Sequence, residues 1–180
     1  GYVVECVSLS AGHVEVLESR FVCFGTAMTR LAKTVLVGVV DQYCYGEPSA
    51  VAILTGKLVT NANDMHAAVV AFGAASLSDV AALEDALKRI GEQLLCYRGL
   101  CTGLQGKAFL PDCLVPVFEA LSHVTYGANL MGAGSGGFIL GVLKDGCSRE
   151  AARDAACEAV RSSGHEQAVT LSLEHASLVV

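Results

Sequence analysis

A run of glycines and other small residues, set between two apolar segments, constrains the fold of this chain more than any other feature. Residues 131–138 have the sequence Met-Gly-Ala-Gly-Ser-Gly-Gly-Phe, and a β-rich segment continues to Leu143 before a Lys-Asp-Gly turn. That segment is too short and too rich in β-formers to be a helix of useful length. We therefore expect 132–137 to join two antiparallel strands, one ending near Met131 and one spanning 138–143.

The glycines formally match GxGxxG through Gly132, Gly134 and Gly137. A dinucleotide-binding fingerprint needs a helix directly after its glycines, and the β-rich segment excludes one. No Gly-Lys-Ser/Thr ends the run, so it is not a Walker loop either. Glycines still permit positive φ and let N–H groups approach a phosphate. We predict a phosphate-proximal loop; the alternative is a tight hairpin whose small residues serve packing alone.

Apolar periodicity indicates the remaining elements. The first two strands are expected to be neighbours separated by Ala11-Gly12-His13, and 99–111 is expected to be a loop. One helix is predicted to start at the Ser76-x-x-Asp79 pattern, and another to bend near Gly56. The full set comprises strands at 3–9, 20–24 and 169–173 besides those flanking the glycines, and helices at 27–45, 50–71, 76–97, 113–121 and 148–164.

Helices in this order lie between strands connected as hairpins or split βαβ units. The expected fold class is α+β, with a ferredoxin-like antiparallel sheet and helices packed on one face. The 180 residues, 53% of them hydrophobic, are enough for one domain with its own core. The chain opens on an apolar, strand-like pattern without a methionine. We therefore expect 1–180 to be a fragment of a longer polypeptide.

Charge and hydropathy exclude several classes of protein. The net charge is −6 and no basic stripe exists, which argues against a nucleic-acid partner. The longest uncharged stretch, Ala120–Leu143, contains several polar residues and glycines, so no membrane partner is expected. The eight cysteines form no CxxC pair, and no secretory signal is present. We expect reduced thiols and a cytoplasmic location, and no metal site.

Two segments resemble a known family. Asn129–Phe138 looks like the third conserved motif of the GHMP kinases, which include galactokinase and the homoserine, mevalonate and phosphomevalonate kinases. Phe21–Lys33 resembles the Thr-Arg-Leu-Ala segment of the L-fucokinase branch, which also contains heptose 7-phosphate kinases. Val59–Phe72 is similar to that branch's Asn-x-x-Asp helix. Two departures are Phe24-Gly25-Thr26 in place of Tyr-Thr-Gly, and Arg98 in place of a tryptophan.

The resemblance implies the C-terminal domain of an ATP- and Mg²⁺-dependent kinase that phosphorylates the anomeric hydroxyl of a sugar. The substrate would be L-fucose or a relative such as D-arabinose or a heptose phosphate. In this branch the kinase is often fused to a nucleotide-sugar pyrophosphorylase. The first phosphate loop and the catalytic base belong to the N-terminal domain of such enzymes, and this sequence lacks them. The implied partners are that N-terminal domain, the sugar and, in a dimer, a second copy.

The resemblance also assigns candidate site residues. The nucleotide-side loop consists of Gly132, Ala133, Gly134, Ser135, Gly136 and Gly137, and no residue of the chain is assigned as catalytic. Possible substrate or phosphate contacts are Thr26, Thr29, Arg30 and Asp64. Each has a plainer alternative: Arg30 as a surface ion pair, Asp64 as a solvated residue of an amphipathic helix, and Ser135 as a small residue tolerated among glycines. The rival function is a non-catalytic ferredoxin-like module for metabolite binding or dimerisation.

Overall fold

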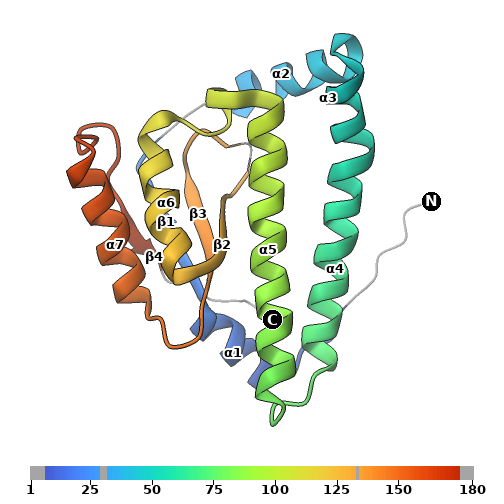
Figure 1. The fold of residues 1–180 in the computed structure, drawn as a ribbon, viewed down its shortest axis with the longest axis vertical. Helices are drawn as coiled ribbons and strands as arrows, with labels where there is room; N and C mark the ends of the chain where they lie inside the picture. The colour runs from blue at the N-terminus through green and yellow to red at the C-terminus, as the bar shows by residue number, and fades with distance from the viewer. Residues whose placement is uncertain (1–6, 29–31, 133, 175–180) are drawn as a thin grey trace.

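A four-stranded antiparallel sheet and the helices between its strands make up the chain in the computed structural model, which describes residues 7–28, 32–132 and 134–174 (Figure 1). The α-helices and strands are, in chain order, α1 (Ala11–Arg20), β1 (Phe21–Gly25), α2 (Ala32–Tyr45), α3 (Pro48–Ala52), α4 (Leu58–Ala74), α5 (Val80–Gln105), α6 (Val115–Val124), β2 (Thr125–Leu130), β3 (Phe138–Leu143), α7 (Arg149–Ser162) and β4 (Ser172–Glu174). A π-helical turn, Ile53–Lys57, joins α3 to α4, where the sequence predicted a bend at Gly56.

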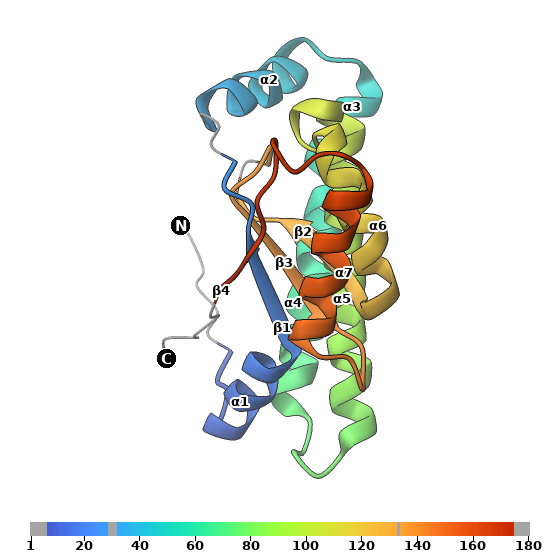
Figure 2. The ribbon, with the colours of Figure 1, turned by 90° about the vertical axis from the view of Figure 1, so that its left-hand side faces the viewer.

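The sheet has the strand order β2-β3-β1-β4, and every neighbouring pair is antiparallel. Strands β1 and β2 run in the same direction with β3 between them, and β3 and β4 run together with β1 between them. This double split βαβ arrangement confirms the predicted ferredoxin-like α+β fold. Figure 2 shows α5, α6 and α7 on one side of the sheet, as expected.

One face of the sheet packs against α6 and α7. Phe24 pairs with Ile139 across β1 and β3, and Leu130 pairs with Ile139 across β2 and β3, so all three point to the same face. They are buried in one cluster together with Leu121 of α6 and Ala156 of α7. A second cluster of buried residues lies between α1, α4, α5 and the β3 end and includes Leu17, Ala68, Phe72, Leu87, Ile90 and Val142.

Helix α5 lies along the edge strand β2 at unusually short range. Gly91 on the helix faces Tyr126 and Gly127 on the strand, and a Cβ on Gly91 would lie only 2.5 Å from the Cβ of Tyr126. Both glycines are buried. Two glycines therefore set the distance between α5 and β2. A side chain on Gly91 would overlap the strand, and one on Gly127 would overlap the main chain of the helix.

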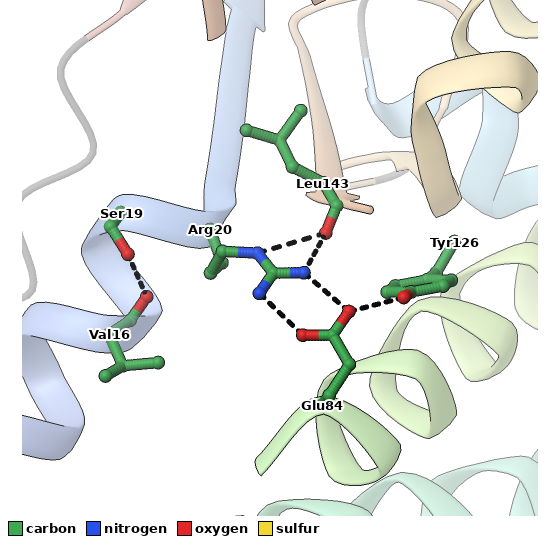
Figure 3. A network of polar contacts seen from close by, with 6 residues as sticks. All are labelled: Val16, Ser19, Arg20, Glu84, Tyr126 and Leu143. Atoms are coloured by element: carbon green, nitrogen blue, oxygen red, sulfur yellow. Dashed lines mark hydrogen bonds and ion pairs between the residues drawn. The ribbon is translucent and has the colours of Figure 1, made fainter. Parts of the chain in front are cut away.

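At the end of the sheet where β3 stops, an ion pair joins α1 to α5 (Figure 3). Arg20 donates two hydrogen bonds to the carboxylate of Glu84, at 2.6 and 2.8 Å, and also donates to the carbonyl of Leu143. Tyr126 donates its hydroxyl to the same carboxylate. The hydrogen bond from Arg20 is the main reason that the pKa of Glu84 lies below its usual range. The bidentate geometry makes this pair stronger than an ordinary surface ion pair.

Replacing Glu84 with Gln is expected to lower the free energy of unfolding by about 2 kcal/mol at neutral pH, because Arg20 and Tyr126 lose a charged acceptor. A lowered folded-state pKa contributes stability above the unfolded-state pKa of about 4.3, and that stability is lost as pH falls through the folded value. The difference between wild type and E84Q should therefore shrink in acid, as measured by urea unfolding at neutral and acidic pH.

The matched control is Glu92→Gln on the same helix. Glu92 pairs with Lys88 at 3.9 Å, and both side chains are about half exposed. Such exposed pairs contribute about 0–1 kcal/mol, so E92Q should change the free energy of unfolding little at either pH. Equal effects of E84Q and E92Q, or an effect of E84Q that persists undiminished in acid, would contradict the assignment.

The start of the described chain corrects one prediction. No strand precedes β1 in residues 7–20, and the expected turn at Ala11-Gly12-His13 is the first turn of α1. Ser10 caps that helix by accepting the N–H of His13. The imidazole of His13 in turn lies 2.9 Å from the carbonyl of Ala75 beyond α4. Capping and this long-range contact therefore favour helix where composition suggested a turn. The remainder of the predicted strand, residues 3–6, lies outside the described residues.

Other helix and strand boundaries in the structure also differ from the predicted ones. The loop expected from Gly99 is helix as far as Gln105, because Cys101 is buried in the core and packing outweighs the low helix propensity of Gly99 and Gly103. Asp79, rather than Ser76, caps α5 by accepting the N–H of Ala82. Within the described ranges α2 begins at Ala32, later than the predicted residue 27. Strand β4 covers 172–174 instead of 169–173.

Candidate functional site

Residues 132–137, named the glycine loop, join β2 to β3 as the sequence predicted. The described residues of the loop all have positive φ: Gly132 (79°), Gly134 (89°), Ser135 (66°), Gly136 (138°) and Gly137 (81°). A succession of left-handed residues turns main-chain N–H groups away from any helical or strand ladder. No helix begins at 136–138, so the dinucleotide fingerprint is excluded by the structure as well as by the sequence.

The glycine loop is held on one side by the chain that follows α5. The N–H of Ser135 donates to the carbonyl of Phe109 at 2.7 Å, and its hydroxyl donates to the carbonyl of Ala108. Ser135 is completely buried. Both polar groups of Ser135 are therefore used to anchor the loop, which favours a positioning role over a hydroxyl donated to phosphate.

On the other side the glycine loop is held by the end of β1. The carbonyl of Gly137 accepts the N–H and the hydroxyl of Thr26, at 2.8 and 3.1 Å. The N–H of Gly137 donates to the carbonyl of Met28 at 3.2 Å. A Cβ on Gly136 would lie 2.6 Å from the Cβ of Met28. The segment after β1 and the loop thus fit together only because Gly136 has no side chain.

Three main-chain donors of the glycine loop are not used by this framework. The N–H groups of Gly132, Gly134 and Gly136 make no hydrogen bond with any residue in the described ranges. Convergent N–H groups of left-handed residues are a recurrent anion cradle in proteins. In the described structure the loop therefore has three unbonded N–H donors, while the donors of Ser135 and Gly137 keep its shape.

A hollow of about 450 Å³ opens beside the glycine loop, between α2, α4 and α5, and Gly132 contributes to its wall. The wall is mainly apolar, with Leu36, Leu58 and Phe109 among its residues. Burial raises the pKa of Tyr97, another wall residue, to about 12, so its hydroxyl remains protonated at neutral pH. The buried amide oxygen of Gln105 has no hydrogen-bond partner in the described part of the chain.

No protein-family model and no curated protein sequence matches this chain. Among solved structures it is similar to L. major mevalonate kinase in complex with R-mevalonate, with a TM-score of 0.56 and 13% identity over 95% of this chain and 44% of that one. It is also similar to the Lin0012 protein from Listeria innocua, with a TM-score of 0.56 and 11% identity over 87% of this chain and 39% of that one. The fold of this chain is thus similar to part of the mevalonate kinase structure.

These similarities concern the fold, because the identities are low. The chain spans less than half the length of either solved structure, and nearly all of it is covered by the match to the mevalonate kinase. The α+β architecture implied by the glycine motif is therefore shown. The fucokinase branch and its sugars receive no support from these two similarities and belong to the proposal below.

Of the other predicted site residues, the structure describes Thr26 and Asp64, which lie in different surroundings. Thr26 is completely buried and supports the glycine loop, as described above. Asp64 is exposed on α4 and lines a separate groove of about 480 Å³ together with Lys57 and Gln93. Thr29, Arg30 and Ala133 lie outside the described residues. Contact of Thr26 or Asp64 with a sugar or a phosphate remains a prediction.

Sequence reasoning missed the role of residues 106–109. This segment, which begins with the 3₁₀ turn Gly106–Ala108, supplies both carbonyls that hold Ser135. It also places Lys107 next to the loop's anchor, where the ammonium pairs with Asp112 at 2.5 Å. No local pattern could have revealed these contacts, because main-chain carbonyls carry no sequence signature. The nearby lysine was the only visible signal.

The described residues contain no clustered set of metal-binding side chains. In those ranges no three His, Cys, Asp or Glu side chains are grouped so that they could hold a metal. No chemistry of a bound metal is therefore assigned to them. In the same ranges each cysteine is a free thiol, and no helix has both the length and the apolar composition needed to cross a bilayer.

Proposed function

We propose that this chain is the substrate-side domain of an ATP-dependent sugar kinase of the GHMP type. The observation that carries the proposal is the glycine loop: a left-handed connection between β2 and β3, anchored on both sides, with the N–H groups of Gly132, Gly134 and Gly136 uncommitted in the described structure. The similarity of the fold to a mevalonate kinase supports the assignment to a kinase in general. The Phe21–Lys33 resemblance supports L-fucose, D-arabinose or a heptose phosphate as substrate, phosphorylated at its anomeric hydroxyl.

In this proposal the chain supplies part of a composite site. Phosphoryl transfer depends on positioning and on neutralising the phosphate charges. The glycine loop contributes N–H dipoles to the nucleotide side, and the anchors at Ser135 and Thr26 keep those dipoles in place. ATP, bound with its magnesium ion by the N-terminal domain, supplies the phosphoryl group. The catalytic base also belongs to that domain, so the chain alone should be inactive.

The test is an ADP-release assay with ATP and either L-fucose or D-arabinose. It is run on this chain and on a longer protein that contains it after a GHMP N-terminal domain. Sugar-dependent turnover by the longer protein alone is the expected result. Turnover by the isolated chain would contradict the composite site, and inactivity of the longer protein with all these sugars and with heptose phosphates would contradict the kinase assignment.

Arg30 provides a prediction from the sequence resemblance. If its guanidinium binds phosphate or the reacting sugar, Arg30→Ala should lower kcat/KM of the longer protein about tenfold or more, equivalent to about 1.4 kcal/mol of transition-state stabilisation. The matched control is Arg161→Ala, because Arg161 lies on α7 and is exposed beside Glu158 at 3.4 Å. Wild-type kinetics for R30A would leave only the surface ion-pair alternative.

One observation keeps the rival, a non-catalytic metabolite-binding or dimerisation module, open to test beside the kinase. Helix α2 exposes large apolar side chains, with Leu36 55%, Val40 57% and Tyr43 58% exposed. Under the kinase proposal the N-terminal domain covers this surface, and under the rival a second copy covers it. A dimer that forms through α2 in the longer, inactive protein would support the rival. A kinase-active monomer would exclude it.

A further inference from the structure

A small pocket lies at the end of the sheet away from the glycine loop. It has a volume of about 160 Å³ and is formed by α5, α6, β2 and the residue that follows β3. Two of its lining residues are cations, Arg98 and Lys144, and no acid is found among the lining residues in the described ranges. We name it the Arg98 pocket. The glycine loop precedes β3 and Lys144 follows it, so the pocket is distinct from the proposed nucleotide side.

Arg98 is a half-buried arginine against which no carboxylate of the described residues lies. One guanidinium nitrogen, Nη1, donates to the carbonyl of Ala128 at 2.7 Å, and the guanidinium carbon lies 4.2 Å from the ring centre of Phe118. Burial alone lowers the pKa of Arg98 to about 10, and no charged neighbour offsets it. An arginine has five N–H donors, so the carbonyl uses a minority of them. A desolvated cation without a counter-charge is an unfavourable arrangement that an anion would relieve.

Lys144 provides the second positive charge. Its ammonium donates to the carbonyls of Ser122 and His123, at 2.8 and 3.1 Å, at the end of α6. These carbonyls belong to the last turn of α6, where the helix dipole gives a partial negative charge, so they orient the lysine and offset only part of its positive charge. Tyr126 also lines the pocket, but its hydroxyl donates to Glu84, and that carboxylate is paired with Arg20. The carboxylate that Tyr126 contacts is therefore already paired with a cation.

We propose that the Arg98 pocket binds a small tetrahedral oxyanion, with inorganic phosphate or a phosphoryl group as the ligand. The guanidinium fork matches two oxygens of such a group, and the lysine adds a point charge. The volume is several times the space that one water molecule needs, yet it is too small to enclose a whole nucleotide. The ligand is thus an ion or the exposed phosphoryl end of a larger molecule.

The test is an NMR titration of this chain that follows the amides of Gly127 and Ala128, which line the pocket. The titrants are sodium phosphate, ADP and, at equal ionic strength, sodium chloride. Saturable shifts with phosphate but not with chloride support the site. Shifts with ADP as well identify a nucleotide-borne phosphoryl group as a second source of the same chemistry. Absence of saturation by both phosphate and ADP at tens of millimolar overturns the proposal.

Variants locate the site. Lys144→Met and Arg98→Lys should each weaken phosphate binding about tenfold or more. K144M keeps the proposal testable if R98K disturbs the packing on Phe118. The control is Lys88→Met on α5, since Lys88 is exposed and lies outside the pocket. Unchanged phosphate affinity in a folded K144M, or equal losses in K88M and K144M, would overturn the proposal. None of these results depends on kinase activity.

Discussion

Gly91→Ala is expected to destabilise the chain by about 2–3 kcal/mol, the range typical of overpacking a rigid core site. The added methyl would lie 2.5 Å from the Cβ of Tyr126 and 3.0 Å from the main-chain nitrogen of Gly127. Neither atom belongs to a flexible side-chain end, so helix α5 must move away from β2 to make room. That movement would also pull Glu84 away from Arg20 and Tyr126 at the same end of the sheet.

The matched control for Gly91 is Gly103→Ala on the same helix. No atom lies within 4 Å of the position that a Cβ on Gly103 would take, and Gly103 is exposed. Alanine is a better helix former than glycine by about 1 kcal/mol, so G103A should stabilise the chain. The two substitutions should thus have opposite signs in urea unfolding. Stabilisation by G91A would show that helix and strand do not approach as closely as the structure places them.

Gly136→Ala is expected to reduce phosphoryl transfer by the longer protein by about a hundredfold or more, equivalent to about 2.7 kcal/mol. The alanine Cβ would lie 2.6 Å from the Cβ of Met28 and 2.9 Å from its carbonyl oxygen. A φ of 138° is also strongly unfavourable for alanine. The glycine loop must therefore change shape, and its unbonded N–H groups turn away from the phosphates. The measurement is kcat/KM for ATP together with thermal unfolding.

Gly164→Ala is the matched control for Gly136. Gly164 has a φ of 72° at the end of α7, and no atom lies within 4 Å of its Cβ position. G164A therefore carries the backbone cost of an alanine at positive φ without touching the glycine loop. G164A should lose less stability than G136A, because it lacks the close contact with Met28, and loss of turnover is expected in G136A alone. Full activity of a folded G136A would show that the loop's shape does not matter for the reaction.

Most of the fold around the glycine loop could be predicted from the sequence. The small residues at 132–137 and the β-rich segment after them indicated a strand connection, and β3 spans 138–143 as predicted. Ser148 was predicted to start a helix and caps α7 by accepting the N–H of Ala151. These features depend on contacts within a few residues, namely turn conformation, alternation and capping, so a local pattern contains them.

Features that depend on distant partners could not be predicted. The helix at 11–20 is stabilised by the contact of His13 with Ala75, 62 residues away, and the continuation of α5 past Gly99 depends on core burial of Cys101. Glycine composition suggested turns in both places, and tertiary packing outweighed it. The Arg98 pocket is a further case, since nothing in the sequence connects Arg98 to Lys144.

By itself the sequence determined that residues 132–137 are glycines and other small residues. It thereby determined where the backbone can be left-handed and where N–H groups can be presented to an anion. Only the tertiary structure decided which of those groups remain unbonded. The N–H groups of Ser135 and Gly137 donate to the carbonyls of Phe109 and Met28, which come from the segments that follow α5 and β1. The physical reason is that main-chain hydrogen bonds have no residue signature, so their partners are defined by packing alone.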